Sequence, residues 1–223
     1  MGRFQCLVSQ TIRDRKPRTL TPAEYLKLLP LYQPRERLAI KIAGWPGTRR
    51  SEGFGLKWQD LDFNREVVTF RQGFVSGRIT RLKTEASRTE MSIPAAVKEA
   101  LLDWKENTPY SAPGDWVFAS PATKGKRPFW PDSMLANYIQ LIAVAAGLGH
   151  IGWHTSRHSF CGWGKSALKL DETKELACQQ NIATTSDLYG GMSLDAKRKA
   201  QSRLVEYVHR EAKKRPFTSL LRN

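Results

Sequence analysis

Two short segments of this chain place cationic side chains where they could bind and activate a phosphate. The segment 47–52 (GTRRSE) carries Arg49 from a turn into a predicted helix start, where a guanidinium and backbone N–H groups can hold a phosphate together. Lys83 lies in KTEASR at a predicted turn between two strands, from which an ammonium could protonate a leaving oxygen. Ordinary structural explanations exist for both: Arg49 could simply pair with Glu52, and hairpin lysines are commonly solvated.

Two further segments supply a proton-exchanging group and a nucleophile. In HTSRH, His154 and Arg157 are three residues apart and share one face of a predicted helix, so both could address one phosphate. In NIATTSDLYG, Tyr189 ends a predicted helix and is followed by glycine. Taken alone, an HxxR pair is common, and a tyrosine in such a place is usually a half-buried amphipathic residue.

Together, the four segments hold a residue set that can cleave a phosphodiester without a metal. Arg49 and Arg157 would neutralise the two non-bridging oxygens, and Tyr189 would attack as the nucleophile to form a phosphotyrosine ester. Lys83 would protonate the departing 5′ oxygen, while His154 would assist proton transfer or hold the phosphate. No cluster of His, Asp or Glu has metal-ligand spacing, so we predict no metal site and no cofactor.

In this order, the segments resemble the catalytic domain of the tyrosine recombinase (phage integrase) family of site-specific DNA recombinases. GTRRSEGFGLKWQDLD is similar to the family's first-arginine motif, and KTEASRTEMSIP to its hairpin-lysine segment. HTSRHSF is similar to the His-x-x-Arg-His box and NIATTSDLYG to the nucleophile box, so the matches run from about Thr21 to Gly190. The resemblance implies a recombinase or integrase that cleaves and rejoins DNA through a 3′-phosphotyrosyl intermediate.

The resemblance also assigns roles to individual residues. Carried onto this chain, the family's catalytic positions fall on Arg49, Lys83, His154, Arg157 and Tyr189, with Glu52 and His158 in supporting positions. One catalytic position departs from the family pattern, because Gln179 stands where members usually carry His or Trp. Glutamine can hydrogen-bond a phosphate oxygen but cannot exchange a proton, which implies slower strand exchange or a divergent subgroup.

The charge of the chain favours a polyanionic partner. Lys and Arg number 36 against 21 Asp and Glu, which gives 223 residues a net charge of +15. A solubilising surface charge is the ordinary alternative, and double-stranded DNA is the partner that the family resemblance implies. The basic residues expected to contact DNA are Arg50, Arg81, Arg88, Lys124, Lys126 and Arg127.

The elements that must position these side chains are predicted to form a mainly α fold with a small antiparallel β-sheet, an α+β class. Periodicity and capping signals predict a helix that begins at Thr21, and further helices over 34–44, 50–56, 95–107, 132–146, 154–168, 172–178, 182–188 and 194–213. Alternating segments predict one three-stranded sheet from 66–72, 77–83 and 89–94, and a short strand over 116–120. Trp58 and Trp153 are expected in the core and Trp130 on the surface.

The domain organisation is expected to be simple. Residues 1–20 carry five basic residues and one acid and are expected to form a basic arm or the remnant of a linker. Residues 21–223 are expected to form one catalytic DNA breaking–rejoining domain that ends in a C-terminal helix. The helical core-binding domain that family members usually carry ahead of it is expected to be absent. The basic C-terminal helix could pack on its own domain or dock on a neighbouring protomer.

The sequence and its family resemblance also predict the assembly and the location of the protein. The resemblance implies a homotetramer on DNA, and we expect a monomer without it. No apolar run reaches the roughly 20 residues that a membrane span needs, so no membrane partner is expected. The cysteines at 6, 161 and 178 are widely spaced, which argues against a disulfide framework and favours a cytoplasmic, nucleoid-associated protein.

Two alternatives to a recombinase remain open from the sequence. A type IB topoisomerase-like enzyme would share this residue set but reseal the original DNA ends. A non-catalytic DNA-binding protein could use the same scaffold, with Gln179 as an early sign of decay.

Overall fold

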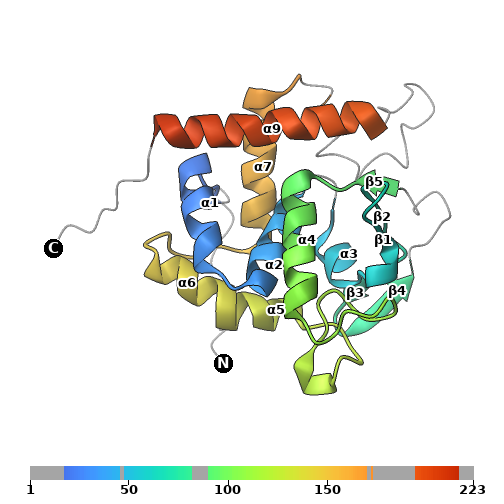
Figure 1. Ribbon diagram of the computed structural model, residues 1–223. Coiled ribbons are helices and arrows are strands. Elements are labelled where there is room, and N and C mark those ends of the chain that lie inside the picture. Colours follow the sequence, from blue (N-terminus) through green and yellow to red (C-terminus); the bar gives the residue numbers. More distant parts are fainter. Residues whose placement is uncertain (1–17, 46–47, 82–89, 170–171, 173–193, 216–223) are drawn as a thin grey trace, which may run out of the picture.

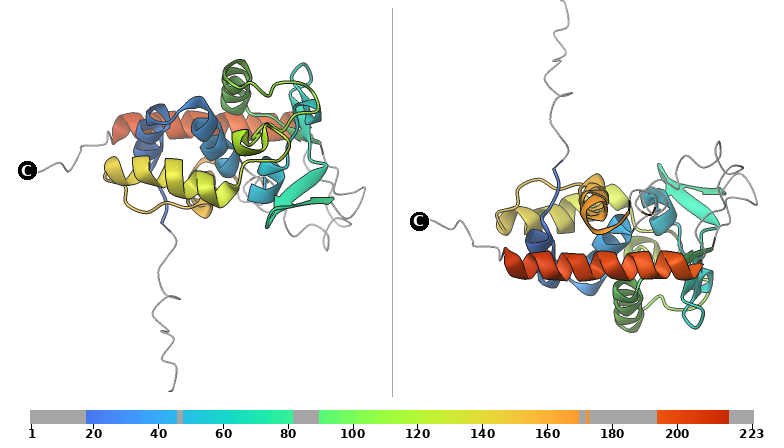
Figure 2. Two further views of the ribbon diagram at one scale, coloured as in Figure 1. Left: turned by 90° about the horizontal axis from the view of Figure 1, so that it is seen from below. Right: turned by 90° about the horizontal axis from the view of Figure 1, so that it is seen from above.

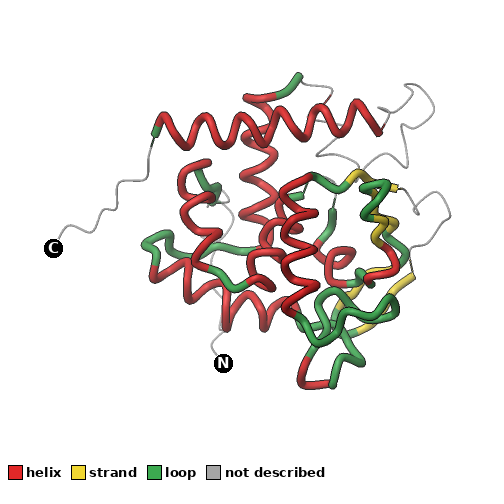
Figure 3. The backbone as a smooth tube through the Cα atoms, in the orientation of Figure 1, coloured by secondary structure: helices red, strands yellow, loops and turns green. Residues whose placement is uncertain are grey.

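The computed structural model describes residues 18–45, 48–81, 90–169, 172 and 194–215, and every structural statement concerns these residues. In this part of the chain, a helical body carries two small β-elements along one side (Figures 1 and 3). The helices are α1 (Pro22–Leu28), α2 (Pro34–Gly44), α3 (Arg50–Phe54), α4 (Ala95–Asn107), α5 (Pro131–Met134), α6 (Gln140–Ala145), α7 (Trp153–Ala167) and α9 (Leu194–Lys214), with a π-helical segment, η6 (Leu135–Ile139), between α5 and α6. The strands are β1 (Leu61–Asp62), β2 (Val67–Thr69), β3 (Gln72–Val75), β4 (Arg78–Arg81) and β5 (Glu90–Ser92).

Helix α1 begins where its capping signal predicts. The Thr21 hydroxyl accepts a hydrogen bond from the Glu24 N–H, and the Glu24 carboxylate accepts one from the Thr21 N–H. Pro22 occupies the first helical position, where its missing N–H costs nothing. Just ahead of this cap, Leu20 is tied to α7: its N–H donates to Ser159 Oγ, and its carbonyl accepts from the Trp163 indole.

Helix α2 forms the centre of the helical body. It packs against α4 and against α7, and its bounds are those expected from the sequence. Leu38 and Ile42 on α2 are buried, as are Leu101 on α4 and Trp163 on α7. The site-bearing helix α7 is therefore held by the core along much of its length.

The C-terminal helix α9 packs back on its own domain. It lies across α1 and α7 and also contacts β5 (Figure 2). Ala200, Leu204 and Val208 form its buried stripe at helical spacing, and Gln201 accepts a hydrogen bond from the Ser92 hydroxyl. Of the two placements that the sequence left open, the described part of this helix takes the one within the domain.

The β-region differs from the predicted single sheet. Strands β1, β2 and β5 form an antiparallel sheet in that spatial order, with Val68 opposite both Leu61 and Met91. The described part of segment 77–83 was wrongly placed in this sheet, because among the described residues β4 pairs only with β3, in a separate hairpin. The ladder breaks between β2 and β3, where Phe70 is buried and Arg71 Nε forms an ion pair with Asp60. The turn of the hairpin needs positive φ at Ser76 and Gly77, the pattern of a type I′ turn.

Segment 116–120 was also wrongly predicted to be a strand. In the described structure it makes two isolated bridges, Lys57 with Trp116 and Ala119 with Pro128. Each bridge joins a single pair of residues, so no continuous strand forms. The tryptophan predictions are confirmed: Trp58 and Trp153 are buried, whereas Trp130 is exposed and lies edge-on to Phe74 of the hairpin. The predicted helices over 172–178 and 182–188 lie outside the described residues, apart from Glu172.

Candidate active site

Arg49 sits at the N-cap of α3 and is held there by one carboxylate. The Glu52 carboxylate accepts from the Arg49 backbone N–H at 2.9 Å and from Arg49 Nη1 at 3.3 Å. The Glu52 side chain is nearly buried, with 11% exposed, whereas the Arg49 side chain is 49% exposed. This arrangement fixes the backbone N–H and one guanidinium nitrogen of Arg49, and it leaves the rest of the guanidinium accessible to a ligand.

Arg157 reaches the same place from α7. Its Nη1 donates to the carbonyl of Thr48 at 2.9 Å, directly ahead of Arg49 in the chain. Thr48 is buried, so this bond ties α7 to the turn that starts α3. Two guanidinium groups far apart in sequence therefore converge on one short segment.

The electrostatics of Glu52 reflect this convergence. Burial raises the pKa of the Glu52 carboxyl above its ordinary value. The hydrogen bonds from Arg49 and the charges of Arg49 and Arg157 act in the opposite direction but do not overcome burial. One carboxylate is thus shared by two cations, which leaves positive charge for a phosphate to neutralise.

His154 is exposed on the first turn of α7, between the buried Trp153 and Thr155. The helix begins after Gly152, whose N–H donates to the Thr155 hydroxyl at 2.9 Å, and Trp153 packs edge-on against Phe54 of α3 with ring centroids 5.2 Å apart. This packing joins the start of α7 to α3. The printed contacts bring Arg157, Arg49 and Glu52 to one region, and His154 lies three residues before Arg157 on α7, a spacing at which two side chains share a helix face.

The remaining candidates are only partly described. Lys83, Arg88, Gln179 and Tyr189 lie outside the described residues, and Arg81 is described only as the last residue of β4, paired with Gln72. Their roles stay predictions.

The basic residues expected to contact DNA take two kinds of place. Arg50 forms an ion pair with Asp132 at 2.7 Å, which links α3 to the start of α5. Lys124, Lys126 and Arg127 are exposed in the loop that precedes α5. Neither the Thr48 carbonyl nor Asp132 was predicted from the sequence, because a backbone acceptor or a single helix-start acid carries no signal of its partner.

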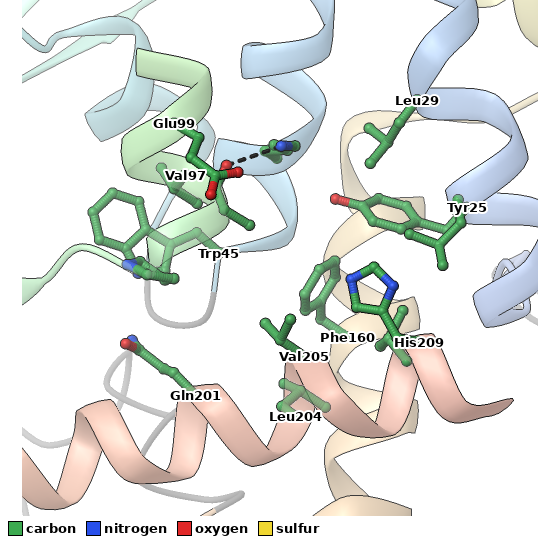
Figure 4. Close-up of a pocket in the computed structure, with 15 residues that line it drawn as sticks. Tyr25, Leu29, Trp45, Val97, Glu99, Phe160, Gln201, Leu204, Val205 and His209 are labelled. Carbon is green, nitrogen blue, oxygen red and sulfur yellow. Dashed lines mark hydrogen bonds between the residues drawn. The ribbon is translucent and has the colours of Figure 1, made fainter. Parts of the chain in front are cut away.

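A cavity of about 230 Å³ lies apart from these residues, between α9 and the helices that α9 covers (Figure 4). Its walls are mostly apolar and include Tyr25, Phe160, Leu204 and Val208. Of the candidate catalytic residues that the structure describes, Arg49, His154 and Arg157, none lines it. The Arg49 side chain, by contrast, lies at the surface with 49% of its area exposed, and Arg157 is partly buried.

Two further features are absent from the described residues. None of the helices there combines the length and apolar character needed to cross a bilayer. No three or more His, Cys, Asp or Glu side chains gather there as a potential metal site.

Comparison with known proteins identifies the sequence pattern. The sequence model of the phage integrase family matches residues 18–189. No curated protein sequence matches the chain.

Solved structures similar to this one include three that represent different recombinases. The Tn1549 transposon integrase, solved with circular intermediate DNA, gives a TM-score of 0.61 at 21% identity over 86% of this chain and 68% of that one. The integrase of mycobacterium phage Brujita gives 0.55 at 20% identity over 93% and 61%, respectively. XerA recombinase gives 0.54 at 18% identity over 84% and 65%. At these identities, the likeness establishes a common fold: mainly helical, with small antiparallel sheets.

Proposed function

The chain belongs to the phage integrase family, and from this membership we propose that it is a site-specific DNA recombinase that cleaves one strand at a time through Tyr189. The observation that carries the proposal is the convergence of Arg49 and Arg157 on one short segment: Arg49 bonds the buried Glu52, and Arg157 bonds the Thr48 carbonyl and lowers the pKa of Glu52 by its charge. Two preorganised guanidinium groups on an exposed surface suit the non-bridging oxygens of a scissile phosphate.

The proposed chemistry needs only groups of the protein. The Tyr189 oxygen attacks the phosphorus, a tyrosyl P–O bond forms, and the bond to the 5′ oxygen breaks. The Tyr189 phenol gives up its proton to solvent or to His154, which assists proton transfer or holds the phosphate, and Lys83 donates a proton to the departing 5′ oxygen. Attack by the 5′ hydroxyl of a partner strand reverses these steps and releases Tyr189.

The proposal extends to the assembly. We propose that double-stranded DNA is the substrate, with four protomers joining on it and single protomers in its absence. A molar-mass measurement in solution with and without target DNA tests this assembly. Relaxation of supercoils by monomers without a specific site would favour the topoisomerase alternative instead.

A suicide substrate that traps the covalent complex tests the nucleophile. Wild type is expected to form a protein–DNA adduct, and Tyr189→Phe is expected to form none while keeping nearly all DNA affinity, because only a hydroxyl is lost. Tyr207→Phe, on α9, is the matched control and should form the adduct normally. An adduct with Tyr189→Phe would refute the assignment, and DNA binding without any wild-type adduct would favour a non-catalytic protein.

A further inference from the structure

Helix α7 displays two imidazoles one helical turn apart. His154 and His158 are both exposed, and their ring centroids lie 6.0 Å apart with the planes tilted by 38°. Residues four apart share one face of a helix, so these two rings can approach the same point in space. Two histidines at this helical spacing are a recurring way to bind zinc, and the prediction of no metal site from the sequence did not consider this pair.

We propose that His154 and His158 form a binding site for a divalent transition-metal ion. An imidazole nitrogen binds zinc at about 2.0–2.1 Å, which places two ring centroids about 5 Å apart around a tetrahedral ion. The observed 6.0 Å is close to this value, and small χ rotations of two exposed side chains close the difference. The backbone of α7 needs no change.

The ligand set defines which metals bind. No third His, Cys, Asp or Glu among the described residues completes the site, so water fills the remaining coordination positions. Imidazole nitrogen suits Cu²⁺, Ni²⁺ and Zn²⁺, whereas Mg²⁺ prefers oxygen ligands. Arg157 lies between the two histidines in sequence and disfavours a cation by its charge. Binding therefore depends on coordination by the two imidazoles. Affinity should be higher for Cu²⁺ than for Ni²⁺ and Zn²⁺, and Mg²⁺ should not bind.

Occupancy would interfere with the reaction, a consequence that rests on the proposed function. A metal ion takes the ring nitrogen of His154 that would otherwise contact the phosphate or exchange a proton. Covalent adduct formation should then fall as Cu²⁺ or Zn²⁺ is added, stay constant with Mg²⁺, and recover when a chelator removes the ion.

Electron paramagnetic resonance of Cu²⁺ bound to the full chain tests the site itself. Wild type is expected to bind one ion whose spectrum reports two nitrogen ligands. His154→Gln or His158→Gln should weaken binding at least about tenfold, the low end of the loss seen even for residues that only support a metal ligand. His150→Gln is the matched control: His150 is exposed and four residues before His154, but it precedes α7 and should not contribute.

The outcomes separate the metal site from the proposed reaction. A two-nitrogen spectrum that survives either α7 substitution, or an equal loss with His150→Gln, would overturn the site. Binding as expected, together with an adduct yield that copper leaves unchanged, would overturn the inhibitory consequence. A wild-type chain that forms no adduct even without metal would count against the proposed recombinase, while the copper spectra would still decide the site.

Discussion

At the scale of single residues, the site depends on a carboxylate that is costly to ionise. Burial raises the pKa of Glu52, so the folded protein holds a proton at pH values where the unfolded chain has lost it. Ionisation of Glu52 therefore costs folding free energy, and the cost grows as the pH rises through the raised pKa. The carboxylate is still needed in this position, because it accepts hydrogen bonds from both the backbone and the side chain of Arg49.

Glu52→Gln should consequently separate stability from activity. At neutral pH the variant should unfold with equal or higher free energy than wild type, since no charge is buried. Cleavage should slow by up to about 10²-fold, the cost of an ångström-scale misplacement of a catalytic group. Denaturant unfolding and adduct formation measure the two effects. The stability difference should vanish in acid, where Glu52 of wild type is protonated; a variant less stable than wild type at neutral pH would contradict the argument.

Neighbouring arginines provide a second test at this scale. Arg49→Ala should slow cleavage by about 10²–10³, the cost of losing one preorganised donor to developing negative charge. Arg50→Ala is the matched control, because Arg50 pairs with Asp132 and not with Glu52, and saturating protein removes any effect of Arg50 on DNA affinity. Single-turnover cleavage at saturating protein measures both variants. Equal losses would mean that positive charge near α3 matters more than the placement of one guanidinium.

At this scale, the structure shows the contact that the sequence offered as the ordinary structural explanation for Arg49, while the catalytic roles stay predictions. The Arg49–Glu52 pair could be read from a spacing of three residues at a helix start, and the structure confirms the contact. The bond from Arg157 to the Thr48 carbonyl joins residues more than a hundred positions apart, and a backbone acceptor carries no sequence signature. Tyr189, Lys83 and Gln179 stay predictions from the motif order.

At the scale of elements, the predictions that rest on local sequence signals match the structure, and those that depend on strand pairing do not. The capping box at Thr21 and the proline at position 34 define helix starts within a few residues, so α1 and α2 match expectation. Strand pairing is non-local. Alternation identified 77–83 as extended, but which partner it pairs with depends on the buried bend at Phe70 that divides β2 from β3. Strand β1 has only two residues and no alternation to detect.

Helix α9 offers a stability test of the element packing. Leu204 is 3% exposed and packs against the helical body, so Leu204→Ala should lower the free energy of unfolding by about 2–5 kcal/mol. Glu206→Ala changes an exposed position of the same helix and should have little effect. Denaturant unfolding of the three proteins measures this. Equal stability of Leu204→Ala and wild type would mean that α9 contributes little to holding α1 and α7.

At the scale of the whole molecule, the positive charge is spread over distant surfaces. Lys124 and Lys126 are exposed in the loop before α5, at one end of the molecule, and Lys213 and Lys214 are exposed at the C-terminal end of α9, on the opposite side (Figure 1). The loop is linked to the candidate site, because Asp132 at the start of α5 pairs with Arg50 of α3. DNA that reaches Arg49 and Arg157 should therefore contact the loop lysines and leave the α9 pair in solvent.

This difference predicts how salt changes DNA binding. Each phosphate that the protein neutralises contributes about −0.9 to the slope of log affinity against log salt on duplex DNA. Lys124→Gln with Lys126→Gln should make the slope shallower by about 0.9 for each phosphate that the loop no longer neutralises. Lys213→Gln with Lys214→Gln removes the same charge and should leave the slope unchanged. Affinity titrations over a range of salt concentrations measure both slopes. Equal changes in the two double variants would mean that net charge, and not one face of the molecule, attracts the DNA. The difference between the two salt slopes thus reports whether DNA binds around the Arg49–Arg157 site.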